Sequence, residues 1–253
     1  MTAPQPVVVP TASFLMPPAA GVPAIPVYLE QVYWWAYVHP AAVRLFERQW
    51  LVQLILFGNY ARLRDAALAE LGATVTGRTL QVACAYGDLT PRLLDSLAPG
   101  ATLDVVDVLP IQLRNLASKL GADPRVSLVQ NDACALSCAD ARYDQVLLFF
   151  LLHEQPAHVR RATLSEAMRV VKPGGKVVIV DYHRPARFHP LRPLLTRVLR
   201  RLEPYALDLW VHEVADFLSP AARQSLVTKQ TFFGGLYQQV VLVADSTARL
   251  ATR

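Results

Sequence analysis

Short apolar runs alternate with helical patterns and with glycine, proline or aspartate turns from residue 80 onward. The runs cover residues 80–84, 102–106, 126–129, 144–152 and 176–180. Apolar runs of this length between helical stretches are typical of a parallel sheet with helices on both faces. Gly234-Gly235 then separates two further strand patterns and predicts a β-hairpin. We therefore predict an α/β fold with a seven-stranded, mostly parallel sheet that ends in an antiparallel hairpin.

The remaining pattern divides the chain into segments. Residues 1–26 contain seven prolines and predict a disordered tail that is unlike a signal peptide, since it has no basic start. Residues 27–75 are rich in aromatic and apolar side chains and predict a helical cap. The main domain is predicted over residues 76–245, with an insertion at 184–222, and residues 246–253 form a short tail.

Within the cap, a helix is expected to open at Pro40 and to stop at Gly58. One face of this helix carries Phe46, Trp50, Leu54 and Phe57. An apolar helix face is usually part of the core, but this one also fits the wall of a lipophilic pocket or a membrane-facing lid. Both interpretations stay open on the sequence alone.

The composition restricts the class of protein. Hydrophobic residues make up 53% of the chain and charged residues only 18%, which indicates one large domain with a continuous core. No apolar run approaches the roughly 20 residues that span a bilayer. The three cysteines show no paired spacing of the zinc or redox type, so we expect a reducing, cytoplasmic compartment.

The net charge of +5 comes from one place. Residues 184–202 hold six arginines and no acid, so this stretch carries +6 and the rest of the chain sums to −1. A local basic stretch argues against nucleic acid as the partner. In the same stretch, leucines at helical spacing oppose the arginines, which fits either a core-packed helix or a helix on an anionic membrane.

A ligand-binding turn is predicted after the first strand, at residues 83–88. Only Gly87 matches the glycine-rich pattern that lets a backbone approach a nucleotide closely. Twenty residues later, Asp107 ends the second strand at the spacing of an acid that binds ribose hydroxyls. The candidate cofactor-binding residues are Gln81, Ala83, Ala85, Tyr86, Gly87, Asp107, Val108, Asp132 and Leu151.

A second group of polar residues follows the fourth and fifth strands, at the edge where open α/β sheets bind ligands. The candidate catalytic residues are His153, Glu154, Tyr182 and His183, and the candidate metal ligands are His153, Glu154, Asp181 and His183. Tyr86 and Tyr182 are further candidates as hydrogen-bond donors to a substrate ring. Histidine and carboxylate side chains suit a divalent metal, although a single histidine on a loop is more often solvated or satisfied by the protein.

These motifs, with Lys172-Pro173-Gly174-Gly175 before the fifth strand, resemble the Rossmann-like core of the class I S-adenosylmethionine-dependent methyltransferases over residues 60–245. Within that superfamily the chain resembles the rhodoquinone biosynthesis enzymes of the RquA type. The strings that carry the narrower resemblance are Tyr33-Trp34-Trp35-Ala36-Tyr37, Val82-Ala83-Cys84-Ala85-Tyr86-Gly87-Asp88-Leu89-Thr90, Leu103-Asp104-Val105-Val106-Asp107-Val108-Leu109-Pro110, Phe149-Phe150-Leu151-Leu152-His153-Glu154-Gln155-Pro156 and Val180-Asp181-Tyr182-His183-Arg184-Pro185.

The resemblance implies amino transfer: a ring methoxy group of ubiquinone is replaced by an amino group, with S-adenosylmethionine as nitrogen donor and Mn(II) as metal. It also implies peripheral contact with the cytoplasmic membrane, where a polyprenyl quinone resides. An ordinary methyltransferase turn would carry an acid where this chain has Gln81. The missing carboxylate would favour the neutral, nucleophilic amine of the cofactor. A quinone C- or O-methyltransferase and a non-catalytic scaffold of a quinone pathway stay open as alternatives.

Overall fold

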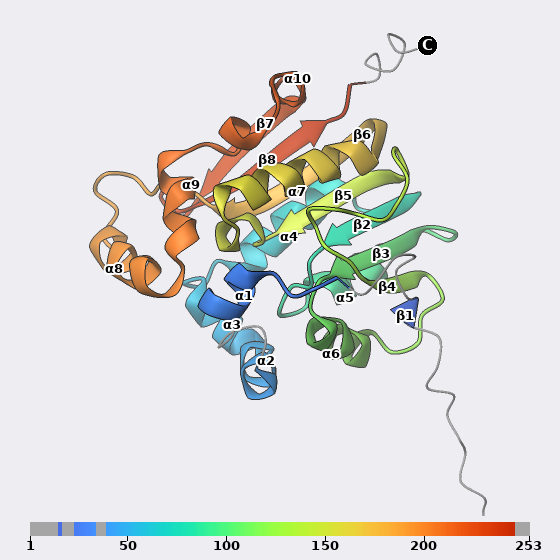
Figure 1. The fold of residues 1–253 in the computed structure, drawn as a ribbon, viewed down its shortest axis with the longest axis horizontal. Helices are drawn as coiled ribbons and strands as arrows, with labels where there is room; N and C mark the ends of the chain where they lie inside the picture. The colour runs from blue at the N-terminus through green and yellow to red at the C-terminus, as the bar shows by residue number, and fades with distance from the viewer. Residues whose placement is uncertain (1–14, 17–22, 34–38, 246–253) are drawn as a thin grey trace, which may run out of the picture.

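The computed structural model describes residues 15–16, 23–33 and 39–245, and its centre is a single mixed sheet (Figure 1). The strands are β1 (Leu15–Met16), β2 (Arg78–Val82), β3 (Thr102–Asp107), β4 (Val126–Gln130), β5 (Tyr143–Phe149), β6 (Val171–Tyr182), β7 (Leu226–Phe232) and β8 (Tyr237–Val243). Their order is β1-β4-β3-β2-β5-β6-β8-β7. All pairs from β1 to β6 are parallel, and β8 runs antiparallel to both of its neighbours.

Seven of these eight strands confirm the predicted sheet and its terminal hairpin. The eighth corrects the prediction of a wholly disordered tail, since Leu15 and Met16 pair with Leu128 and Val129 at the edge of the sheet. The central strands were predictable because they are buried on both faces, which requires nearly continuous apolar sequence.

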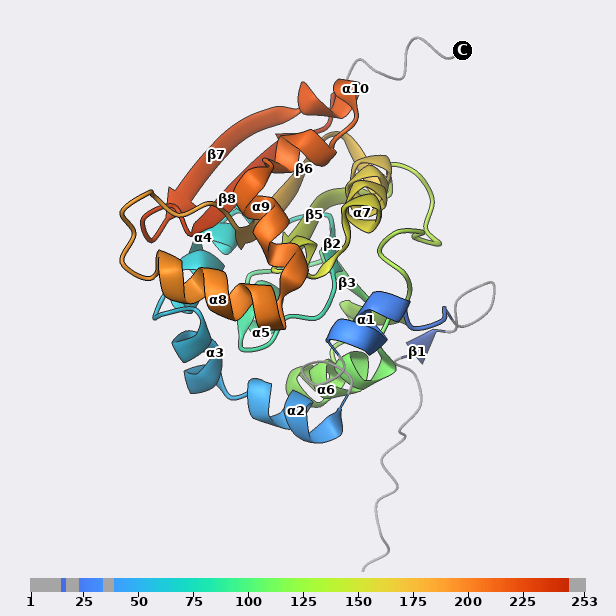
Figure 2. The ribbon, with the colours of Figure 1, turned by 60° about the vertical axis from the view of Figure 1, so that its left-hand side comes forward.

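Helices cover both faces of the sheet. The helices are α1 (Val27–Val32), α2 (Pro40–Phe46), α3 (Gln49–Ile55), α4 (Tyr60–Leu71), α5 (Leu89–Asp95), α6 (Pro110–Leu120), α7 (Ala157–Val170), α8 (Arg192–Leu202), α9 (Asp208–Val211) and α10 (Pro220–Arg223), with a short 3-10 helix, η2, at Leu152–Glu154. Helices α4 and α7 lie on opposite sides of β6 in both views (Figures 1 and 2). Among the described residues, none of the helices combines the length and the apolar character needed to cross a membrane.

The predicted single cap helix from Pro40 to Gly58 is wrong, because two helices occupy this stretch. Helix α2 ends at Phe46, and α3 begins at Gln49 after Arg48 takes an extended backbone conformation. The break frees Glu47 to bond with residues of other elements, described below. Trp34 to Tyr37, which carry part of the resemblance, lie outside the described residues.

Candidate active site

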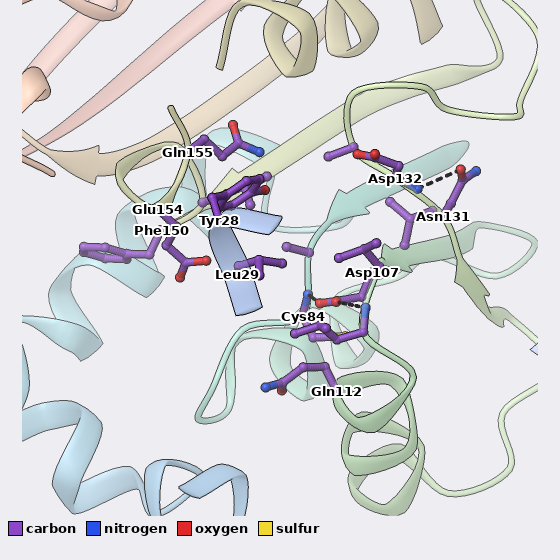
Figure 3. A pocket seen from close by; sticks show the side chains of 16 residues that line it. Tyr28, Leu29, Cys84, Asp107, Gln112, Asn131, Asp132, Phe150, Glu154 and Gln155 are labelled. Atoms are coloured by element: carbon purple, nitrogen blue, oxygen red, sulfur yellow. Dashed lines mark hydrogen bonds between the residues drawn. The ribbon is translucent and has the colours of Figure 1, made fainter. Parts of the chain in front are cut away.

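A small cavity lies at the carboxyl ends of β2, β3 and β5, the edge where sheets of this type bind ligands (Figure 3). Its volume is about 60 Å³. Of the nine predicted cofactor-binding residues, five line this cavity: Ala83, Asp107, Val108, Asp132 and Leu151. We call this the small cavity.

Asp107 is the best-defined polar group of the small cavity. Its two carboxylate oxygens each accept a hydrogen bond of 2.8 Å, one from the backbone N–H of Cys84 and one from that of Leu109. The side chain is buried, and burial raises its pKa to about 6 although both hydrogen bonds favour the carboxylate. The carboxylate therefore links the turn after β2 to the end of β3.

The turn after β2 is shaped by two residues with positive φ. Ala83 has a φ of 71°, a conformation that costs a residue with a Cβ roughly 1–2 kcal/mol. Gly87 has a φ of 82°, and a Cβ placed on it would lie 2.5 Å from the hydroxyl of Tyr60. Glycine is therefore required at position 87, whereas position 83 accepts alanine at the cost of backbone strain.

Glu47 holds this turn from outside. Its carboxylate accepts hydrogen bonds from the Gly87 backbone N–H at 3.2 Å, the Asn115 side chain at 2.5 Å and Lys119 Nζ at 2.7 Å. Lys119 also donates to the Gly87 carbonyl oxygen at 3.0 Å. Sequence reasoning missed Glu47, because its partners lie 40 or more residues away along the chain.

The other predicted cofactor residues lie around the turn without lining the small cavity. Gln81 is fully buried, donates to the Ala83 carbonyl oxygen at 3.0 Å and accepts from the Thr90 hydroxyl at 2.9 Å. Ala85 and Tyr86 face a second, larger cavity instead.

The larger cavity has a volume of about 560 Å³ and is mostly apolar, and we call it the large cavity. Helices α2, α3 and α8 provide its apolar walls. Its polar end is formed by His153, Glu154, Tyr182 and Glu203. Such a cavity accommodates an apolar ligand that presents a few polar atoms at one end.

The two cavities share a wall. Cys84, Phe150 and Glu154 line both of them. Phe150 has a φ of 54°, an uncommon conformation at a residue that separates two cavities. Its ring packs edge-to-face against those of His153 and Tyr182. A group bound in one cavity is therefore a short distance from a group bound in the other.

His153 is the central polar residue of the large cavity. Its ring is buried, with Nδ1 lying 3.0 Å from Asp181 Oδ1 and Nε2 lying 3.0 Å from Glu203 Oε2. Glu154 Oε1 is 3.8 Å from Nε2. Burial alone would lower the pKa of His153, but the Asp181 and Glu203 carboxylates outweigh it and raise this pKa well above 6.5. The two carboxylates therefore favour the protonated form of the ring that they flank.

Asp181 positions this histidine. Beyond the His153 ring, its carboxylate accepts hydrogen bonds from the backbone N–H groups of Leu152, His153 and Tyr182 at 2.7, 3.3 and 2.7 Å. This fully buried side chain has its oxygens occupied by donors of the chain itself.

The four predicted metal ligands do not form one site. His183 lies elsewhere: its Nδ1 is 2.8 Å from the Gly235 carbonyl oxygen, and its Nε2 is 3.4 Å from Glu213 and 2.9 Å from Lys229 Nζ. It lines neither cavity. Across residues 15–16, 23–33 and 39–245, no group of three or more histidine, cysteine, aspartate or glutamate side chains is arranged to hold a metal ion. His183 therefore does not line the cavity that His153 lines, and its catalytic and metal-binding roles stay predictions.

Residues 79–175 match the protein family described as a methyltransferase domain. The N-methyltransferase NodS of Bradyrhizobium japonicum is similar in structure, with a TM-score of 0.54, 15% identity and coverage of 74% of this chain and 99% of that one. Phosphoethanolamine N-methyltransferase 2 of Haemonchus contortus gives a TM-score of 0.60 at 14% identity, covering 86% of this chain and 59% of that one. The chain has the class I methyltransferase fold.

Curated relatives are similar over part of their length. A demethylmenaquinone methyltransferase of Renibacterium salmoninarum is 32% identical over 151 residues, which is 60% of each chain. Its counterpart in Staphylococcus aureus is 29% identical over 135 residues, covering 53% of this chain and 55% of that one. The chain thus spans 60% or less of the length of these two relatives.

Proposed function

We propose that this protein is an S-adenosylmethionine-dependent methyltransferase whose acceptor is the ring of a quinol with a lipophilic tail. The shared wall between the two cavities carries the proposal, because it brings a ribose-type carboxylate site next to an apolar cavity with a proton-handling end. The demethylmenaquinone methyltransferases among the relatives support the same acceptor class.

The donor set of the small cavity fits a nucleoside cofactor. Asp107 would accept from the ribose hydroxyls, and Asn131 and Asp132 at the end of β4 would face the base. When bound, S-adenosylmethionine supplies an electrophilic methyl group on its sulfonium. Tyr28 and Leu29 of α1 project into the cavity, so α1 has to move aside for the cofactor to fit (Figure 3).

The large cavity would hold the acceptor with its ring at the polar end and its tail between α3 and α8. Loss of a ring hydroxyl proton makes the neighbouring ring carbon nucleophilic. In this proposal Glu203 or Glu154 would accept that proton, and the protonated His153 ring, oriented by Asp181, would stabilise the oxygen that gains negative charge. The proton on the methylated ring carbon would then pass to the carboxylate that is still ionised, the other carboxyl group would return its proton to the ring oxygen, and the ring would be aromatic again.

The test is product analysis. Purified protein is incubated with methyl-labelled S-adenosylmethionine and a reduced quinone that lacks a ring methyl group, and the quinone is examined by mass spectrometry. Label in the ring together with one equivalent of S-adenosylhomocysteine supports the proposal. Binding of both compounds with neither product would contradict it and would favour a non-catalytic scaffold.

Amino transfer to ubiquinone is the second candidate, and Gln81 favours it. This amide, bonded to Ala83 in the turn and to Thr90 of α5, stands where an ordinary methyltransferase turn would carry an acid. A nitrogen-15 label in the cofactor amine would then appear in the quinone, without S-adenosylhomocysteine. Mn(II) belongs to this candidate through the resemblance, but the residues predicted to bind it do not fit one ion, so we derive no step through it.

A further inference from the structure

Helix α3 is apolar and yet buries none of its residues. Its seven residues include five apolar side chains, none of which is fully buried, although the half-buried Val52 packs against the core. Trp50 is 60% exposed and Leu54 is 64% exposed. An apolar helix face normally packs against another element, so this face lacks a cover among the described residues.

Helix α8 packs only half of its apolar face. Leu195 and Leu199 are buried, whereas Leu194, Val198 and Leu202 are 54%, 39% and 40% exposed. The three exposed residues are spaced four apart and therefore form a stripe along one side of the helix. One half of the apolar face therefore packs in the core, while the other half is open to a partner, so the predicted membrane-bound alternative stays a prediction.

Both helices line the large cavity, and α8 lies above α3 in Figure 2. Leu54 and Ile55 of α3 line this cavity, as do Val198 and Leu202 of α8. Since the same four side chains are exposed, the cavity reaches the surface between the two helices. We call this surface, formed by Trp50, Leu54, Ile55, Leu194, Val198 and Leu202, the portal.

The charges beside the portal indicate which kind of partner it can bind. Arg197, Arg200 and Arg201 are exposed on α8, and none has an ion-pair partner among the residues that the structure describes. Apolar side chains flanked by arginines match the boundary of an anionic bilayer, where tails and phosphate groups meet. A symmetric contact between two copies would instead bring two strongly basic segments together, which is unfavourable.

We propose that the portal docks on an anionic lipid bilayer and that the acceptor tail passes from the bilayer directly into the large cavity. The identity of the acceptor rests on the proposed function. Docking itself requires only the portal and its arginines, so it can be measured without turnover.

The experiment compares sedimentation of the full chain with vesicles of phosphatidylcholine, with and without phosphatidylglycerol. Replacing Arg197, Arg200 and Arg201 with glutamine should weaken binding to the anionic vesicles on the order of 100-fold, at about 1 kcal/mol per arginine. Trp50→Ser with Leu54→Ser should weaken it at least about tenfold through the lost apolar contact. Added salt should weaken wild-type binding and have little effect on the glutamine variant.

Two matched controls keep their binding if the proposal is right. Val227→Ser removes a side chain that is 60% exposed on β7, outside both cavities. Arg114→Gln removes an exposed arginine on α6. Circular dichroism of every variant separates loss of docking from loss of folding.

Three results would overturn the proposal: equal binding of portal variants and controls, no binding of the wild type, or a stable dimer that Trp50→Ser dissociates. Methylation of a short-tailed quinol in solution tests the proposed function independently of membrane docking. A protein that methylates the short-tailed quinol but ignores vesicles contradicts docking alone. A protein that docks but never methylates contradicts the function alone.

Discussion

Glu203 Oε2 lies 3.0 Å from His153 Nε2, while Asp181 binds the other nitrogen of the same ring. The glutamate directly follows α8 and is separated from His153 by 50 positions in the sequence. The insertion that builds the portal thus also supplies a carboxylate to the polar end of the large cavity.

Glu203→Gln should lower the pKa of His153, because the neutral amide removes one of the two charges that raise it. We expect kcat to fall by about 10²-fold, the lower end of the usual contribution of a proton-transfer group, with KM little changed. The measurement is the pH dependence of kcat together with the titration of His153 by NMR. Glu213→Gln is the control, because it removes a carboxylate beside His183, outside both cavities. An unchanged His153 titration would rule out the coupling.

Asp181→Asn should destabilise the fold. The amide cannot accept all of the hydrogen bonds that the carboxylate accepts, and it leaves the buried His153 ring with one charged partner fewer. A loss of about 3–5 kcal/mol is expected for a broken buried pair. Urea denaturation measures this, with Asp140→Asn as the control, since that exposed pair with Arg169 contributes at most about 1 kcal/mol. Equal losses for both variants would contradict the positioning role.

Cofactor affinity should fall as the pH drops through about 6, where Asp107 takes up a proton. The ionised carboxylate accepts from ribose hydroxyls, and the protonated form loses part of that capacity. The stability of the unliganded fold should change with pH in the opposite direction. Because the pKa of Asp107 is raised in the folded protein, its carboxyl group contributes most stability below its unfolded pKa, and that contribution is lost as the pH rises through about 6. Isothermal titration calorimetry with Asp107→Asn tests the first statement, since this variant should bind weakly and lose the pH dependence. Urea denaturation of the unliganded wild type and variant at several pH values tests the second.

Gly87→Ala and Gly100→Ala separate backbone strain from a steric clash. Both glycines have φ near 80°, so each substitution costs about 1–2 kcal/mol of backbone strain. Only at position 87 would the new Cβ meet a neighbour, the Tyr60 hydroxyl at 2.5 Å, whereas position 100 is open. Gly87→Ala should therefore lose cofactor affinity and additional stability, and Gly100→Ala should bind as the wild type does. Identical binding by the two variants would show that the turn tolerates a shift of Tyr60.

The centre of the sheet was predictable because strands such as β3 and β5 carry their own signal, apolar residues that are mostly buried. Asp107 and His153 were found for a related reason, since Asp107 ends β3 and His153 follows β5 in the short helix η2. Glu47 and Glu203 were missed because each acts on residues brought near only by the folded chain. Glu47 also bears on the wrong prediction for the cap. It lies at the break between α2 and α3, and its carboxylate is bound by Gly87 and Lys119 rather than by neighbours in sequence.

The position of helix α1 affects the rates at which the cofactor binds and leaves. Tyr28 and Leu29 occupy space in the small cavity, so the protein in this state must open before it can bind a nucleoside. The measured affinity is then the intrinsic affinity multiplied by the fraction of molecules with α1 displaced. The same segment has to open again before the spent cofactor leaves. Product release, rather than transfer chemistry, would then limit the rate, and substitutions that loosen α1 would accelerate turnover.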